Sequence, residues 1–174
     1  MHPVKHFITI TKHRNLVMRY CFRVGLYRQG LCHDLSKYSL TEFIPGARYY
    51  NGHLSPNGFQ RDAEGYSSAW MHHKGRNKHH FEYWTDVMKG QEGYQPVPMP
   101  KKYLVESVMD RIAASKVYLG EKYYVGCELD YLEKSNEARM MHPATREALR
   151  QILTMLRDEG MDQTFRYLKH EYLK

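Results

Sequence analysis

Eight residues of two metal-binding types recur along the first two thirds of the chain. They are His13, His33, Asp34, His72, His73, His79, His80 and Asp110. Histidine is the commonest metal ligand and binds through a neutral ring nitrogen, and carboxylates supply harder oxygen donors that can bridge two ions. Donors spread in this way over several elements predict one central metal site.

The doublet His33-Asp34 is the centre of this predicted site. Neighbouring residues on a helix point about 100° apart. Both can therefore reach metal only if two ions, or one ion and a helix end, lie beside them. Lys37 follows Asp34 by three residues and so lies on the same helical face, where its ammonium can hold a phosphate. The segment HDLSK combines a nitrogen ligand, an oxygen ligand and an anion contact.

Asp110 stands on an otherwise apolar helical face that includes Val105, Met109 and Ala113. A carboxylate at such a position is costly unless it is bound to something cationic. The pattern therefore favours a metal ligand over a surface acid. His13 faces inward if the apolar residues of its own helix form core. The remaining histidines are expected at the surface or at helix caps: His2, His6, His53, His142 and His170.

The elements that must position these residues are predicted to be helices, because apolar side chains recur at helical spacing and no alternating strand pattern is present. Ser39 and Glu42 fit a capping box, Asn77 fits a cap, and Pro100 fits the start of a long helix. Residues 52–58 are expected as a loop and residues 90–100 as the one extended connection. The predicted helices span about 4–28, 39–50, 60–74, 77–88, 101–119, 128–139, 143–160 and 162–172. Gly30, Gly75 and Gly120 are expected as stops.

The length predicts one domain over residues 1–174, and the helical pattern predicts that it is an all-α bundle. The metal-site core would occupy about residues 4–120, with helices of about 128–172 packed on it. The three cysteines form no Cys-x-x-Cys pair, which favours a reducing, cytoplasmic setting, and the N-terminal apolar run is too short for a signal or a membrane span. A net charge of +7 favours anionic partners.

The order of these residues resembles the HD-domain superfamily of metal-dependent phosphohydrolases, over about residues 12–116. A lone His, then His-Asp, then further histidines, then a distant Asp is the ligand order of that superfamily. HDLSK is similar to the HD-x-x-K signature of its phosphodiesterase branch. The segment HHKGRNKHHFEYW resembles an uncharacterised HD-like family. The Gly-Tyr-Pro motif of cyclic-dinucleotide phosphodiesterases is missing, which argues against such a substrate.

This resemblance implies a helical bundle of the HD-domain type and assigns roles by position. A first metal would be held by His13, His33, Asp34 and Asp110, with Asp34 as the bridging carboxylate. A second would be held by His72 and either His79 or His80. His72 is slightly favoured over His73, and the choice between His79 and His80 is left open. Glu82 is a candidate for orienting a ligand imidazole.

The chemistry expected of this site is phosphoester hydrolysis, on a nucleotide or another small phosphorylated compound. Two divalent ions about 3.5–4 Å apart can share a hydroxide and hold it for attack on phosphorus. Asp34 and Lys37 are the predicted catalytic residues. Arg14, Lys74 and Arg76 are further candidates for binding the substrate phosphate. One or two ions of Fe, Mn, Zn, Co or Ni fit the mixed donors.

Two alternatives compete with hydrolysis. A di-iron oxygenase on the same scaffold is one, because myo-inositol oxygenase resembles this ligand order too. A non-catalytic binding protein is the other, with KGRNKHH and its flanking aromatic residues contacting nucleic acid. The binding protein is the least favoured, because that stretch uses histidines where lysine or arginine would serve better. A homodimer through the C-terminal helices is left open.

Overall fold

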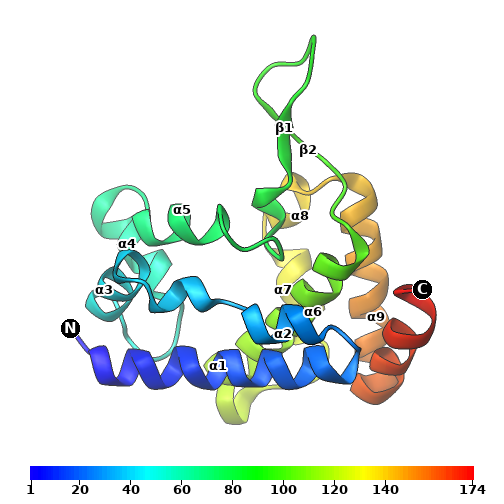
Figure 1. The fold of residues 1–174 in the computed structure, drawn as a ribbon, viewed down its shortest axis with the longest axis horizontal. Coiled ribbons are helices and arrows are strands. Elements are labelled where there is room, and N and C mark those ends of the chain that lie inside the picture. Colours follow the sequence, from blue (N-terminus) through cyan, green and yellow to red (C-terminus); the bar gives the residue numbers. More distant parts are fainter.

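Helices make up nearly all of the regular structure in the computed structural model, which describes residues 1–174 (Figure 1). The expectation of an all-α fold is confirmed. The helices are α1 (Pro3–Arg23), α2 (Tyr27–Cys32), α3 (Leu40–Arg48), α4 (Pro56–Glu64), α5 (Ser68–Lys74), α6 (Lys101–Leu119), α7 (Cys127–Lys134), α8 (Glu137–Met140) and α9 (Pro143–Tyr167). Short 3-10 turns are η1 (Leu35–Tyr38), η2 (Phe81–Tyr83) and η3 (Gly120–Lys122), and a π turn, η4 (Leu168–Tyr172), follows α9.

Helix α6 lies at the centre of the apolar core. Residues 104–109 are buried without interruption, so this helix is covered on nearly every side. Helix α1 packs along it from one direction and α9 from another (Figure 1). Fully buried side chains from all three helices form the cluster, including Val17, Val108, Ile112, Leu153 and Leu156. The element that carries Asp110 is therefore held rigidly between two long helices.

Helix α3 packs against α1, and α5 packs in turn against α3. A Cβ added at Gly46 on α3 would lie 2.4 Å from Nε2 of His6, so only glycine permits this close approach. The expectation that His6 lies at the surface or at a cap is wrong, because its side chain is buried. Positions 6, 10, 13 and 17 of α1 recur at helical spacing and are all buried. The same face that buries His6 therefore turns His13 toward the interior.

Two of the predicted helices are each divided by a glycine in the left-handed region. The span of residues 4–28 is broken at Gly25, whose φ is +83°, so that α1 ends at Arg23 and α2 begins at Tyr27. Gly30, the expected stop, is buried inside α2. The span of residues 60–74 is broken at Gly65, whose φ is +82°. Glycine adopts this conformation at little cost, whereas other residues rarely do.

Residues 77–100 depart furthest from the prediction. The helix expected through residue 88 is absent, and the side-chain nitrogen of Asn77, the predicted cap, donates to Ser36 at 2.8 Å and to the carbonyl oxygen of His73 at 2.9 Å. The chain forms η2 and then an antiparallel hairpin of β1 (Thr85–Val87) and β2 (Tyr94–Pro96), so the expectation of no strands is also wrong. This hairpin projects away from the helices (Figure 1).

The C-terminal half follows the prediction more closely. Helix α6 spans residues 101–119, with Pro100 before it and Gly120 after it, as the sequence predicts. The expected helix of residues 128–139 is divided into α7 and α8, and α9 continues past a non-helical Gly160. His142 caps α9, because its Nδ1 accepts the Ala144 amide at 3.2 Å. None of the helices combines the length and the apolar character that crossing a membrane requires.

Candidate metal centre

The predicted ligands come from five separate stretches of chain that meet beside α6. His13 lies on α1, His73 on α5 and Asp110 on α6, whereas His79 and His80 lie in the turn before η2. The His33-Asp34 doublet follows the end of α2. Residues more than ninety positions apart in the sequence are thus brought together, because α6 and α3 both pack on α1 and α5 packs on α3.

The backbone of the doublet explains how two adjacent side chains face one centre. Helix α2 ends at Cys32, His33 is extended, and Asp34 is left-handed with a φ of +54°. Asp34 is the only residue other than glycine with a positive φ in the chain. Aspartate and asparagine tolerate this conformation better than most residues. The doublet therefore sits at a helix end, one of the two arrangements that the sequence had allowed.

A first group of donor atoms gathers around Oδ2 of Asp34. Nε2 of His13 lies 3.6 Å from that oxygen and 2.9 Å from Oδ1 of Asp110. Nε2 of His33 lies 3.4 Å from the Asp34 oxygen and 3.3 Å from the same Asp110 oxygen. Two imidazoles and two carboxylates thus face one another, with all donor atoms within 4.8 Å.

A second group gathers around the other oxygen of Asp34. Nε2 of His73 lies 3.4 Å from Oδ1 of Asp34, and Nε2 of His79 lies 3.5 Å from it. Nε2 of His80 lies 2.9 Å from Nε2 of His73. Asp34 belongs to both groups, one oxygen to each. The two groups together are buried enough, and close enough, to hold metal ions.

Several of these donor atoms are buried without a hydrogen-bond partner. They are Nε2 of His13, Nε2 of His33, Nε2 of His79 and both carboxylate oxygens of Asp34, of which Oδ2 also forms an ion pair with the Lys37 ammonium. Buried polar atoms in folded proteins are nearly always hydrogen-bonded, because leaving one unpaired costs about 1–3 kcal/mol. Five such atoms gathered in one volume form clusters that could hold a metal ion.

Two buried glutamates stand behind the imidazoles. Oε1 of Glu106 lies 2.9 Å from Nδ1 of His33 and 3.3 Å from Nδ1 of His79. Oε2 of Glu42 lies 2.8 Å from Nδ1 of His73, and its Oε1 lies 2.6 Å from Nδ1 of His72. Carboxylates in this position fix the orientation of imidazole ligands.

The sequence prediction did not identify either glutamate. Glu82, its candidate for this role, makes no hydrogen bond to any histidine, and its Oε2 is buried without a partner. Glu106 precedes Asp110 by one helical turn within an apolar stretch, and that signal could have revealed it. Glu42 was read as half of a capping box, but the Ser39 hydroxyl makes no cap bond and Glu42 turns to the histidines.

Charge complementarity keeps the carboxylates of the centre ionised. Burial alone would raise the pKa of Asp34, but the charges of His33, Lys37 and His73 outweigh it and hold the pKa well below the usual value. The pKa of Asp110 is lowered in the same way by the neighbouring imidazoles of His13 and His33. Deprotonated carboxylates are the form that binds metal.

Only one residue of the His72/His73 pair, and only one of the candidate anion contacts Lys37 and Arg14, lies at the donor groups. His73 belongs to the second donor group, whereas His72 contacts Glu42 and belongs to neither group. The geometry therefore does not support the slight preference for His72. Lys37 lies at the centre, with Nζ 2.6 Å from Oδ2 of Asp34. Arg14 instead donates to the carbonyl oxygen of Leu31.

The stretch KGRNKHH is turned partly inward. Arg76 donates to the carbonyl oxygen of His72, and Lys74 lies half-buried in the last turn of α5. The Trp70 ring stacks on His73 at 5.6 Å and meets His80 edge-on at 4.7 Å. Trp70, one of the aromatic residues expected to contact nucleic acid, thus packs against the histidines of the centre.

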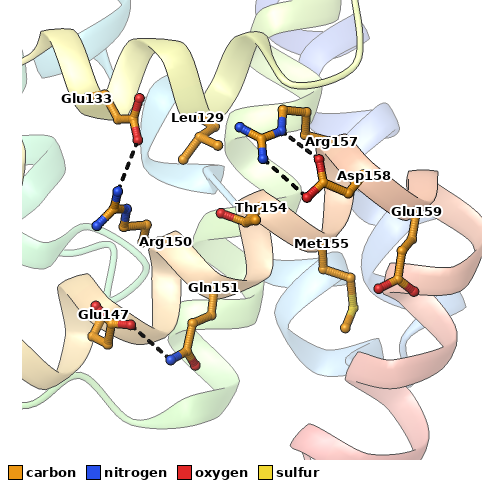
Figure 2. Close-up of a pocket in the computed structure, with 10 residues that line it drawn as sticks. All are labelled: Leu129, Glu133, Glu147, Arg150, Gln151, Thr154, Met155, Arg157, Asp158 and Glu159. Carbon is orange, nitrogen blue, oxygen red and sulfur yellow. Dashed lines mark hydrogen bonds and ion pairs between the residues drawn. The ribbon is translucent and has the colours of Figure 1, made fainter.

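A separate hollow of about 480 Å³ lies between α7 and α9 (Figure 2). Its lining is mostly charged and includes two pairs of opposite charge. Arg150 faces Glu133 at 3.5 Å, and Arg157 contacts Asp158 at 2.7 Å. None of the candidate metal ligands lines this hollow.

Residues 2–155 match a family of unknown function, DUF5662, and the chain therefore belongs to that family. The match includes every candidate ligand and both buried glutamates. No curated protein and no solved structure shows a significant match to the chain.

Proposed function

We propose that this member of DUF5662 is a metal-dependent phosphohydrolase of the HD-domain type, which acts on a nucleotide or another small phosphorylated compound. The observation that carries the proposal is the convergence of buried, unpaired donor atoms on Asp34. The order of the ligands along the chain, with His13 first, the doublet next and Asp110 last, and the helical bundle around them support the HD-domain type.

The donor set fits two divalent ions that share one carboxylate. His13, His33, Asp34 and Asp110 would hold the first ion, and Asp34, His73, His79 and His80 would hold the second. Mixed imidazole and carboxylate donors suit Fe, Mn, Zn, Co or Ni. When bound, such ions lower the pKa of water toward neutrality and polarise phosphoryl oxygens.

Lys37 is the residue of this chain best suited to bind the substrate phosphate. Its ammonium lies 2.6 Å from Asp34, and its side chain is 29% exposed, so it is beside the centre and still reachable from solvent. Burial would lower the pKa of Lys37, but the nearby Asp34 and Asp110 carboxylates outweigh burial and raise it, so this residue stays charged. A fixed positive charge here stabilises the negative charge that develops on phosphoryl oxygens.

Metal analysis and a phosphatase screen test the proposal. Purified protein is expected to carry about two equivalents of transition metal. It should also release phosphate from generic phosphoesters in the presence of Mn²⁺, Co²⁺ or Ni²⁺. Asp34→Asn provides the matched control, because it preserves shape and removes the bridging charge. Normally folded wild-type protein that binds no metal would refute the proposal.

A di-iron oxygenase is the second candidate, because the ligand order resembles that of myo-inositol oxygenase and the donors accept iron. The group around Oδ1 of Asp34 contains three imidazole nitrogens, a donor type that also suits iron. Protein that binds two iron ions, consumes oxygen and hydrolyses no phosphoester would support this reading instead. Hydrolysis without oxygen uptake would exclude it.

A further inference from the structure

Glu106 contacts one imidazole from each donor group with the same carboxylate oxygen. Oε1 lies 2.9 Å from Nδ1 of His33, whose Nε2 faces the first group, and 3.3 Å from Nδ1 of His79, whose Nε2 faces the second. The carboxylate is buried and lies on the rigid helix α6. Asp34 therefore joins the two groups from the inside and Glu106 joins them from the outside.

We propose that Glu106 is a positioning residue that couples the two metal positions, an inference that rests on the metal centre of the proposed function. By accepting a hydrogen bond from each Nδ1–H, Glu106 selects the tautomer that leaves the Nε2 lone pairs of His33 and His79 free to bind metal. Loss of this carboxylate weakens both positions together, although it touches neither ion.

The helix itself explains why one residue can serve both groups. Glu106 precedes Asp110 by four residues, so the two side chains lie on the same face of α6 one turn apart. Asp110 supplies a donor to the first group, and Glu106 supports one imidazole of the first group and one of the second. A displacement of α6 would disturb both groups at once.

Glu42 provides a natural contrast within the same chain. It is also a buried carboxylate that orients imidazoles, but its partners are His73 and His72. Only His73 belongs to a donor group, and that group is the second one. Glu42 thus supports one position, whereas Glu106 supports both.

His33, His79 and Glu106 also lie close enough to hold an ion of their own. The distance of 2.9 Å between Glu106 and His33 is that of a charge-assisted hydrogen bond, and it satisfies both groups without a third ion. Glu106 as a positioning residue predicts two bound ions, whereas Glu106 as a ligand predicts three. A metal titration therefore distinguishes the two roles.

The test is a metal titration of wild-type protein, Glu106→Gln and Glu42→Gln. Each metal-free protein is titrated with Co²⁺, and binding is followed by calorimetry and by the visible absorption of the bound ion. We expect two ions in the wild type. Glu106→Gln should bind both about 10- to 100-fold more weakly, and Glu42→Gln should weaken one of them while leaving the other unchanged.

Two further measurements keep these outcomes separate. Glutamine is nearly isosteric with glutamate, and unchanged circular dichroism and melting temperature of the metal-free variants would exclude general misfolding. Glu106→Asp is too short to reach both imidazoles and should rescue at most one position. If Glu106→Gln bound both ions with wild-type affinity, or lost only one, the coupling would be refuted.

Failure of this inference is distinguishable from failure of the proposed function. A third ion in the wild type that disappears in Glu106→Gln, with the other two unchanged, would make Glu106 a ligand and overturn its positioning role. Wild-type protein that binds no Co²⁺ would remove the metal centre itself. Protein that binds two ions with the expected dependence on Glu106, but hydrolyses no phosphoester, would refute the hydrolase and leave the coupling intact.

Discussion

The hollow between α7 and α9 and the cluster around Asp34 are both rich in charged side chains, but they satisfy those charges differently. In the hollow, acidic and basic groups pair with one another at the surface, as Arg150 does with Glu133 (Figure 2). Around Asp34, donor atoms are buried and several make no hydrogen bond. The charges at the hollow are open to water, whereas the buried cluster could hold a metal ion.

This difference is the reason why we place the proposed function at the buried cluster and not in the open hollow. Exposed ion pairs are screened by water and contribute little, with typical values below about 1 kcal/mol. Buried polar atoms cannot be screened in this way, so an unpaired one must be compensated by a ligand or must cost stability. The strongest indication of function is thus an unmet requirement for bonding inside the molecule.

The largest expected effect comes from removing the charge that both donor groups share. Asp34→Asn should lose both metal ions and reduce phosphoester hydrolysis to background, because each Asp34 oxygen serves one group. Asparagine tolerates the left-handed backbone at this position, so the fold should persist. Elemental analysis and circular dichroism of the variant check both parts, and full metal content in Asp34→Asn would contradict the site.

Loss of Lys37 should lower the rate of hydrolysis without lowering the metal content. Lys37→Ala is expected to lower kcat/KM by about a hundredfold, as removal of a charge-stabilising donor commonly does. Metal content should stay at the wild-type level, because the ammonium is not a ligand. Lys37→Arg retains the charge and serves as the control. Equal loss of metal and activity in Lys37→Ala would show that the lysine is structural.

His6 is a second kind of buried, unpaired histidine, because its Nδ1 has no hydrogen-bond partner and it belongs to neither donor group. Burial, aided by the charge of Lys37, lowers the pKa of His6 to about 4. In the unfolded chain the pKa of a histidine is about 6.5. Between about pH 6.5 and pH 4, His6 is therefore protonated in the unfolded chain and neutral in the folded chain. Stability should decrease over that range and lose nothing more from His6 below it.

Urea unfolding of the metal-free protein at pH 7 and pH 5 measures this effect. His6→Gln removes the titrating group, and it should lose less stability between the two pH values than the wild type, by about 2 kcal/mol. Titration of the central histidines occurs in both proteins and cancels in the difference. Identical losses in the two proteins would show that His6 is protonated in the folded state.

Local sequence signals predicted the long helices and the inward-facing residues well. Pro100 and Gly120 bracket α6 as expected, and the apolar face around Asp110 correctly indicated a carboxylate in the interior. Both signals depend only on residues within a few turns of one another. The ligand series extends over nearly the first two thirds of the chain, and it could be proposed because its members are distinctive residue types in an order that resembles the HD-domain superfamily.

The features that the sequence did not reveal depend on distant partners. Whether His72 or His73 faces Asp34 is decided by how α5 packs on α3, because Glu42 holds both imidazoles from the other side. Asn77 could equally begin a helix or close a turn, and its contact with Ser36, far away in the chain, decides for the turn. Glu106 is recognisable only once His33 and His79 are known to lie beside it.

The smallest effect is expected in the hollow, and Arg150→Ala measures it. The Arg150 side chain is 61% exposed and lies 3.5 Å from Glu133, so water replaces the lost contact at little cost. Unfolding by urea should change by less than about 0.5 kcal/mol, and metal content and hydrolysis should not change. A clear loss of metal in Arg150→Ala would mean that charges on α9 reach the centre through α6. The contrast between a satisfied surface and an unsatisfied interior would then no longer separate the two regions.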